Sequence, residues 1–329
     1  MKFGPVPPSQ AEGAILAHSL ELPGQKLRKG VVLNAEHVAA MQAAGLDSVI
    51  VARLSEDDLH EDAAAAQLAA ALVPAPKGLR LTEAFTGRVN VLAEGPGVAL
   101  LDEARLNAVN EVHPMITVAT VPPYQQMGPR GMVATVKIIS YGVPVADLER
   151  ACALADSAIS FAPPVLKTAS LIVTEIPGGA GEKGVPAIAA RLEALGVTLE
   201  QVVTVPHREG PLAQALQAAQ GELKLILTGS ATSDPMDVAP QAVRRAGGQI
   251  ERFGMPVDPG NLLFLGSLGE ASVIGLPGCA RSPALNGADW VLSRVVCGVA
   301  VGAADIARMG VGGLLKEIPT RPMPRRGKS

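Results

Sequence analysis

The sequence predicts an α/β protein in which a mostly parallel sheet follows a smaller, mixed α+β N-terminal region. From residue 170 onward, short apolar strands alternate with amphipathic helices, which is typical of right-handed βαβ units. The residues before about 165 lack this regular alternation. The chain has 329 residues, of which 48% are hydrophobic, enough for two domains with a sizeable core.

The N-terminal region, residues 1–165, is expected to mix short helices and strands. Asn34 is typical of an N-cap, and Gly45 of the residue that ends a helix. Residues 55–73 predict the clearest helix, with Ser55 as its cap and acidic residues in its first turns, where they suit the helix dipole. Paired prolines at 163–164 predict a linker. The other expected helices cover 35–44, 102–110 and 144–155, and the expected strands cover 48–52, 89–93, 98–101 and 132–139.

Residues 166–309 are expected to form the second domain. Its predicted strands are 170–174, 201–205, 223–228 and 249–253, and its predicted helices are 186–195, 211–220 and 239–246. Residues 262–265 and 272–274 predict a hairpin, and Ser282-Pro283 predicts the cap and first residue of a helix that runs to 296. Residues 310–329, rich in Gly, Pro and Arg, predict a flexible tail.

Composition excludes several function classes. Aromatic residues make up 2% of the chain and the net charge is −3, so neither a base-stacking surface nor a positive field for nucleic acid is expected. The three cysteines lie far apart, which argues against a disulfide framework or a CxxC zinc site. No apolar run of about 18 residues predicts a membrane span, and the first residues lack a signal peptide's apolar region. We therefore expect a cytoplasmic protein with no nucleic-acid or membrane partner.

Two segments could bind a small anion at the carboxyl ends of the predicted strands, where open α/β sheets bind ligands. In the first, a buried strand runs into Thr228-Gly229-Ser230 and then reaches Asp234 and Asp237 before a helix. Small residues let backbone amides approach an anion, and a helix start favours phosphate. An ordinary N-cap is an equally good reading of Asp237. In the second, the turn Gly275–Pro283 places Arg281 where guanidinium and backbone amides could hold a phosphate, although a tight turn with a surface arginine is the alternative.

In order and spacing, these segments resemble the molybdopterin-binding domain of molybdopterin adenylyltransferases, molybdopterin molybdotransferases and the competence-damage amidase family. The matching residues are Thr228-Gly229-Ser230, Asp237, Gly247-Gly248, Pro259-Gly260 and Leu276-Pro277-Gly278. The resemblance implies a three-layer αβα domain with a pocket for the pterin and its phosphate. Together with the residues above, it predicts catalytic roles for Asp237 and Asp234, a metal role for Asp237, and ligand contacts by Thr228, Gly229, Ser230, Thr232, Ser233, Pro259, Gly260, Asn261, Leu276, Pro277, Gly278, Arg281 and Ser282.

The sequence departs from the family pattern at three places. Ser230 stands where a second glycine is usual, Asn261 stands where molybdotransferases commonly have a lysine, and Thr174-Glu175-Ile176-Pro177 replaces a polar Gly-Asp-Glu element. A missing lysine removes a point charge for phosphate or molybdate.

The resemblance implies molybdopterin or molybdopterin-nucleotide binding in molybdenum cofactor biosynthesis. It favours a transferase that moves phosphate, a nucleotidyl group or molybdate, with Mg²⁺ between substrate phosphate and Asp237. There are two alternatives to the transferase. The three departures from the family pattern favour a non-catalytic carrier or insertion factor. A nucleotide hydrolase of the competence-damage type is the other alternative. A homo-oligomer is expected, and a molybdoenzyme or another cofactor-assembly protein is a possible partner.

Overall fold

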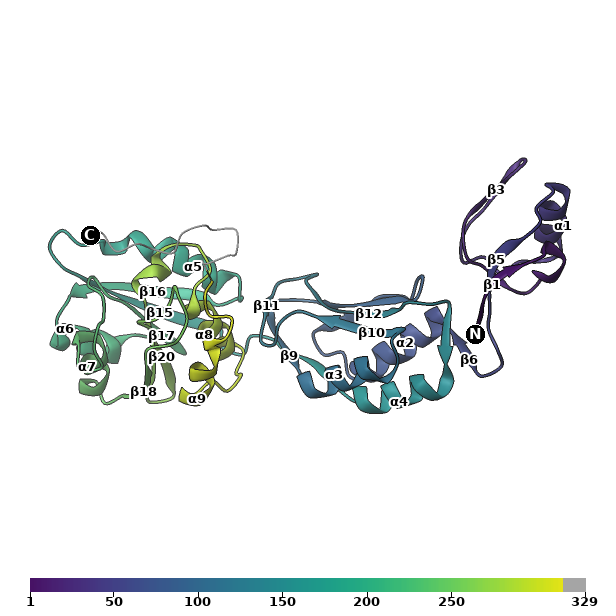
Figure 1. The fold of residues 1–329 in the computed structure, drawn as a ribbon. Coiled ribbons are helices and arrows are strands. Elements are labelled where there is room, and N and C mark those ends of the chain that lie inside the picture. Colours follow the sequence, from purple (N-terminus) through teal and green to yellow (C-terminus); the bar gives the residue numbers. More distant parts are fainter. Residues whose placement is uncertain (316–329) are drawn as a thin grey trace, which may run out of the picture. The chain divides into compact units, whose positions relative to one another are not determined.

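The computed structural model describes residues 1–315 and forms two compact units (Figure 1). The first unit holds residues 1–94, 99–123 and 129–161, and the second holds 95–98, 124–128 and the described chain from residue 162 onward. Most of the tail expected over 310–329 lies outside the described residues.

A six-stranded sheet forms the centre of the second unit. Its strands span β15 Thr168–Glu175, β16 Thr198–Pro206, β17 Leu223–Leu227, β18 Gln249–Phe253, β19 Phe264–Leu268 and β20 Ala271–Leu276. They lie in the order β16–β15–β17–β20–β19–β18, with the first four parallel and the last two antiparallel to their neighbours. Every residue of β17 is buried, as expected for a central strand covered on both faces. The α/β class predicted from the sequence is therefore confirmed.

Helices cover both faces of this sheet. They span α5 Val185–Glu193, α6 Glu209–Ala218, α7 Val238–Arg245, α8 Gly287–Val296 and α9 Ala303–Ala307, with 3₁₀ turns at η2 Gly181–Gly184, η3 Gly278–Arg281 and η4 Arg308–Gly310. The α5 crossover runs from β15 outward to β16, whereas α6 returns across β15 to β17, so right-handed connections put the two helices on opposite faces. α6 and α7 pack over Ile172, Ile226 and Phe264, whereas an ion pair joins α8 to α5. The result is three layers.

Antiparallel sheets and a few helices build the first unit. The elements up to residue 162 are β1 Lys2–Val6, η1 Pro8–Gln10, β2 Ile15–Leu16, β3 Leu20–Leu22, β4 Gln25–Leu27, α1 Ala35–Ala43, β5 Val49–Arg53, β6 Asp58–His60, α2 Glu61–Leu72, β7 Leu79–Leu81, β8 Arg88–Ala93, β9 Gly97–Leu101, α3 Glu103–Val112, β10 Ile116–Thr120, β11 Gln126–Met127, β12 Met132–Ile138, β13 Gly142–Pro144, α4 Val145–Ala155 and β14 Ile159–Ala162. Of these, β11, the first two residues of β9 and the last residue of β14 are assigned to the second unit. The sheet orders are β1–β5–β2, β3–β4, β13–β6, β11–β9–β14 and β10–β12–β8–β7. Figure 1 shows α2, α3 and α4 along one face of the last sheet. The mixed α+β character expected of this region is confirmed.

The helix expected over 55–73 begins later than predicted. α2 starts at Glu61 with His60 as its cap, so the role given to Ser55 is wrong. Asp58 instead accepts a hydrogen bond from the Ser55 amide (2.7 Å) and lies in β6, which pairs with β13. Pairing with a strand more than eighty residues away fixes these residues in an extended conformation that overrides the local helix signal.

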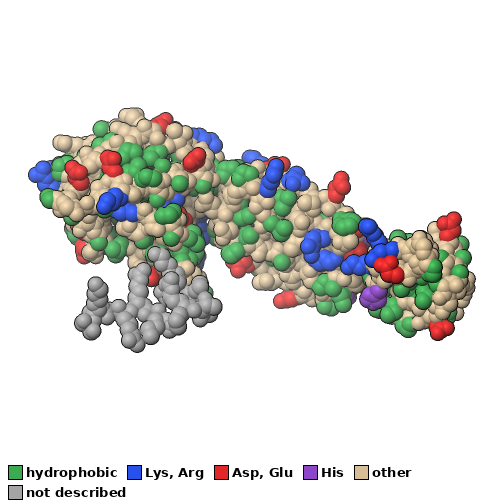
Figure 2. All heavy atoms as spheres, turned by 90° about the horizontal axis from the view of Figure 1, so that it is seen from above, with side chains coloured by type: hydrophobic (Ala, Val, Ile, Leu, Met, Phe, Trp, Pro, Cys, Tyr) green, Lys and Arg blue, Asp and Glu red, His purple; other side chains and the backbone are tan. Residues whose placement is uncertain are grey.

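On the face drawn in Figure 2, basic and acidic side chains are interspersed among hydrophobic ones. Within residues 1–315, no helix combines the length and the apolar character that a membrane crossing requires.

Candidate functional site

The parallel strands of the second unit end at one edge of the sheet. Val173 of β15 pairs with Leu227 of β17, and Leu227 pairs with Leu276 of β20. The turns that follow β17 and β20 therefore leave the sheet side by side, at the edge where ligands of open α/β sheets bind. Leu276 and Pro277 are themselves buried, so Gly278, and not either of these side chains, is exposed at this edge. An added Cβ on Gly278 would meet no atom within 4 Å, so space is open beside that turn.

The turn after β17 is anchored to the end of β15. The Gly229 amide donates to Thr174 Oγ1 (3.0 Å), and Thr174 Oγ1 lies 2.8 Å from His207 Nδ1. An added Cβ on Gly229 would lie 2.7 Å from the Thr174 carbonyl oxygen, so this close approach requires glycine. Thr228 Oγ1 donates to the Ser230 carbonyl (2.6 Å) and curls the turn back on itself.

Three successive backbone amides in this turn lack a hydrogen-bond partner among the described residues, and two of them belong to exposed residues. Within the described part of the chain, the amides of Ser230, Ala231 and Thr232 have no hydrogen-bond acceptor. Ser230 and Ala231 are exposed, whereas the Thr232 side chain is buried against Thr228 Oγ1 (3.4 Å). Successive amides in a turn form a concave donor surface that suits an anion. These amides are one of two features at this edge that suit a phosphate.

The two carboxylates of the turn shape the loop. Asp237 caps α7: its Oδ1 accepts from the Val238 amide (2.7 Å) and its Oδ2 from the Ser233 amide (3.0 Å). Asp234 Oδ1 accepts from the Met236 amide (2.7 Å), and Asp234 is exposed. Residues 1–315 hold no group of three or more His, Cys, Asp or Glu that could bind a metal. These residues alone do not make a Mg²⁺ site, so the catalytic and metal roles of Asp237 and Asp234 stay predictions and we derive no step through Mg²⁺.

Arg281 joins the two turns. Its Nη1 donates to the Gly181 carbonyl (2.7 Å), and its Nη2 donates to the Thr228 carbonyl (2.9 Å). An added Cβ on Gly184 would lie 2.7 Å from Arg281 Cγ, so glycine leaves the room that the arginine stem occupies. Burial lowers the pKa of Arg281. Among residues 1–315, no carboxylate forms an ion pair with Arg281, so its positive charge remains available to an anion at this edge.

The helix after the second turn starts later than the sequence predicts. Ser282 does not cap it: α8 begins at Gly287, and Asn286 is the N-cap, with its side-chain oxygen accepting from the Ala288 amide (3.0 Å). Asp289 completes a capping box by accepting from the Asn286 amide (2.8 Å). Ser282 and Pro283 are residue types that favour the N-cap and first position of a helix. The Asn286–Asp289 pair caps the helix with two hydrogen bonds instead. Ser282 therefore stays in the loop, where its Oγ accepts from the Ala284 amide (3.2 Å).

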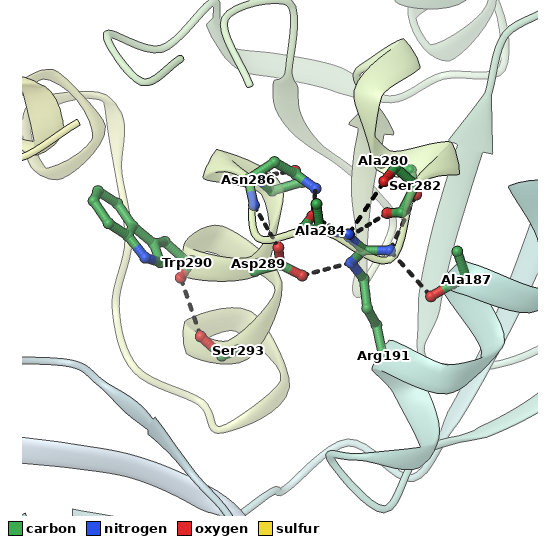
Figure 3. A network of polar contacts seen from close by, with 10 residues as sticks. Ala187, Arg191, Ala280, Ser282, Ala284, Asn286, Asp289, Trp290 and Ser293 are labelled. Carbon is green, nitrogen blue, oxygen red and sulfur yellow. Dashed lines mark hydrogen bonds and ion pairs between the residues drawn. The ribbon is translucent and has the colours of Figure 1, made fainter. Parts of the chain in front are cut away.

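A mostly buried arginine clamps this loop (Figure 3). Arg191 of α5 forms a 2.5 Å ion pair with Asp289, in which the two side chains are only 10% and 14% exposed. Its other guanidinium nitrogens donate to the carbonyls of Ala187 (3.1 Å), Ala280 (3.0 Å), Ser282 (2.8 Å) and Ala284 (3.0 Å). The loop that carries Arg281 is thereby fixed to α5.

The third predicted loop, residues 259–261, packs against the start of α8. The Pro259 carbonyl accepts from the Gly287 amide (2.8 Å). An added Cβ on Gly260 would lie 2.8 Å from the same Gly287 nitrogen, and Gly260 has a φ of +145°. Asn261 closes its own loop by accepting through its carbonyl from the Met255 amide (3.0 Å). This loop therefore supports the second turn through α8.

The sequence did not indicate three of the residues at this edge as site residues. Arg191 and His207 carry no local signal, because each acts through partners distant in sequence. Thr174 stands out only as a polar residue at the end of an apolar strand, and its hydroxyl joins His207 to the Gly229 turn.

Two family models match parts of this chain. A family model described as a probable molybdopterin binding domain matches residues 170–296, and one described as a domain of unknown function (DUF8806) matches residues 5–53. A search of curated proteins gave no match. The crystal structure of a molybdopterin biosynthesis MoeA protein from Pyrococcus horikosii covers 91% of this chain and 74% of its own length, at 10% identity and a TM-score of 0.28. The family assignment therefore rests on the domain match.

Proposed function

Because residues 170–296 belong to the molybdopterin-binding domain family, we propose that this protein binds molybdopterin or its nucleotide form at the edge formed by the Gly229 and Gly278 turns. A role in molybdenum cofactor biosynthesis follows from the family. We propose the bound form of the pterin and the reaction in addition to this role.

One observation carries this assignment: Arg281 bridges the two turns without a carboxylate partner among the described residues. Both of its hydrogen bonds go to carbonyls, so its charge is not neutralised. A phosphate beside it would gain a charge-assisted hydrogen bond, which is about twice as strong as a neutral one.

The unpaired amides of the exposed residues Ser230 and Ala231 supply the remaining phosphate contacts. Backbone donors need no rearrangement when the anion arrives, because the turn is already held by Thr174 and Asp237. Ser230 in place of a glycine leaves its amide available, so this departure from the family pattern is compatible with binding. The open space beside Gly278 would take part of the pterin.

For the reaction, we propose a transferase that moves phosphate, a nucleotidyl group or molybdate on the bound molybdopterin. The second candidate is a non-catalytic carrier or insertion factor, favoured by Asp237, whose two oxygens each already accept a backbone amide. We also propose that the protein forms a homo-oligomer and that its partner is a molybdoenzyme or another cofactor-assembly protein.

Titration calorimetry with molybdopterin and with its adenylylated form tests the binding site. We expect Arg281→Gln to weaken binding by roughly 10- to 100-fold, the effect of losing a hydrogen bond to a charged group. Arg245→Gln is the matched control, since Arg245 is exposed in the last turn of α7. Equal affinity of the two variants, or no binding of either pterin at high micromolar concentration, would refute the proposal.

A turnover assay with molybdopterin, Mg-ATP and molybdate separates the two candidates. Product that disappears in Asp237→Asn, while pterin affinity and the urea midpoint stay close to those of the parent protein, would support the transferase and reject the carrier. Pterin binding without product formation would support the carrier.

A further inference from the structure

The first unit contains a cavity of about 550 Å³ that the proposed function does not use. Its walls come from the residues after β4, the turn before β8, β8, the start of α2, and the end of β12 with the residues that follow it. We propose that this cavity binds a phosphate monoester that carries a planar ring.

The floor of the cavity holds a neutralised carboxylate. Glu61 is 12% exposed, and its Oε2 lies 3.5 Å from Lys137 Nζ, which also donates to the Thr86 carbonyl. An added Cβ on Gly87 would lie 2.4 Å from Glu61 Oε2, and Gly87 has a φ of +68°, so the turn needs glycine for two reasons. The Gly87 amide donates to Asp62 (2.6 Å) and locks the turn onto α2. Because Lys137 balances Glu61, the floor does not repel an anion.

Hydrogen-bond donors are left over on the cavity wall. Arg88 and Asn90 alternate along β8 with the buried Val89, which places their side chains on the cavity side of the strand. Asn90 Oδ1 accepts from Thr135 (2.9 Å), so its amide NH₂ remains for a ligand. Thr82 Oγ1 accepts from the Asn90 amide (3.0 Å), so its hydroxyl proton is also available.

The charge of the wall favours an anion. Arg88 has no acidic partner among residues 1–315, whereas exposed Glu83 is the only lining carboxylate besides Glu61. With Lys29 and Lys137, the lining carries three cations against two carboxylates. Three kinds of convergent donor (guanidinium, amide and hydroxyl) match the three terminal oxygens of a phosphate monoester.

Two exposed apolar side chains indicate the rest of the ligand. Phe85 is 75% exposed and Ile139 is 55% exposed, and both line the cavity. The volume lies within the range of roughly 300–1,000 Å³ that is usual for small-molecule sites, and far exceeds that of a bare phosphate. An aromatic or heterocyclic ring against Phe85 would cover this surface.

Calorimetry with phenyl phosphate tests the proposal, with inorganic phosphate and benzyl alcohol as partial ligands. The full chain carrying Arg281→Gln is used as the parent, so that phosphate binding at the Gly229 turn is weakened and can be told apart from binding in this cavity. We expect saturable binding of phenyl phosphate, weaker binding of inorganic phosphate and none of benzyl alcohol. Arg88→Gln should weaken phenyl phosphate binding by at least about tenfold, as expected when a hydrogen bond to a charged group is lost.

Arg80→Gln is the matched control, because Arg80 is exposed on the neighbouring strand β7 and does not line the cavity. It should leave the affinity unchanged. Phe85→Ala, a change at a largely exposed side chain, should weaken phenyl phosphate but not inorganic phosphate. No saturable binding, or equal losses in Arg88→Gln and Arg80→Gln, would overturn the proposal. Circular dichroism of each variant confirms that it is folded.

Discussion

The Arg191–Asp289 clamp should dominate the stability of the second unit. Replacing Arg191 by Met keeps an apolar stem of similar length but removes the charge and every guanidinium hydrogen bond. Exposed ion pairs contribute about 0–1 kcal/mol, whereas removal of one partner of a buried pair costs about 3–5 kcal/mol. With 10% and 14% exposure, this pair is mostly buried and lies closer to the buried class than to the exposed one. We expect Arg191→Met to lower the free energy of unfolding by about 4 kcal/mol.

Such a loss would be large against the roughly 5–15 kcal/mol that typically stabilises a domain. The assay is a urea titration followed by the fluorescence of Trp290, the single tryptophan, which follows Asp289 in α8. Asp289→Asn should cost less, because its amide oxygen still accepts from Arg191. The variant that carries both Arg191→Met and Asp289→Asn should lose less stability than the sum of the two single losses, by at least about 1.5 kcal/mol.

Arg308→Met is the control for this experiment. Arg308 forms an ion pair with Asp305 in the same unit, but at 3.9 Å and with the arginine 81% exposed. We expect a change of no more than about 0.5 kcal/mol there. If Arg191→Met changes the unfolding free energy by less than about 1 kcal/mol, burial does not decide the strength of this pair and the reasoning is wrong.

Three further predictions concern the same unit. Gly229→Ala should destabilise it by roughly 1–3 kcal/mol and weaken pterin binding, because the new methyl group meets the Thr174 carbonyl at 2.7 Å; urea titration and calorimetry measure the two effects. Asp237→Ala should cost about 1 kcal/mol through the lost helix cap, seen as a lower urea midpoint at unchanged slope. Burial raises the pKa of the Cys297 thiol from 9.0 to about 11, so the unfolded chain ionises first and stability falls as the pH rises from 9 toward 11. Cys297→Ala should show a smaller fall over that interval in parallel titrations; an identical fall would contradict this assignment.

The elements of the second unit follow closely from local sequence. β17 is a continuous apolar run and α7 lies between Asp237 and Gly247-Gly248, so length, cap and ending residue all agree with the observed strand and helix. The same local rules fail at Ser55, where a distant strand decides the start of the helix, and at Ser282, where a stronger capping signal a few residues later decides it. Asp58 belongs to a strand that pairs with β13, and Asn286 forms the stronger capping box.

Part of the candidate site could likewise be predicted from local sequence, and part could not. Its glycines, Asp237 and Arg281 could be named from the sequence, because tight turns and helix caps demand particular residue types within a few positions. The Thr174–His207–Gly229 chain of contacts could not, since it joins residues 33 and 55 positions apart. The cavity beside Phe85 and Arg88 likewise appears only when β8, α2 and β12 come together.

By itself, the sequence determined the α/β class of the second unit, the order of its strands and helices along the chain, and the residue types at its two glycine turns. Each of these depends on apolar periodicity or backbone constraints within some ten residues. Tertiary structure alone decided that Arg281 bridges the two turns and that Arg191 fixes the loop behind them. The physical reason is that strand pairing, and not distance along the chain, sets which loops meet at the edge of a sheet.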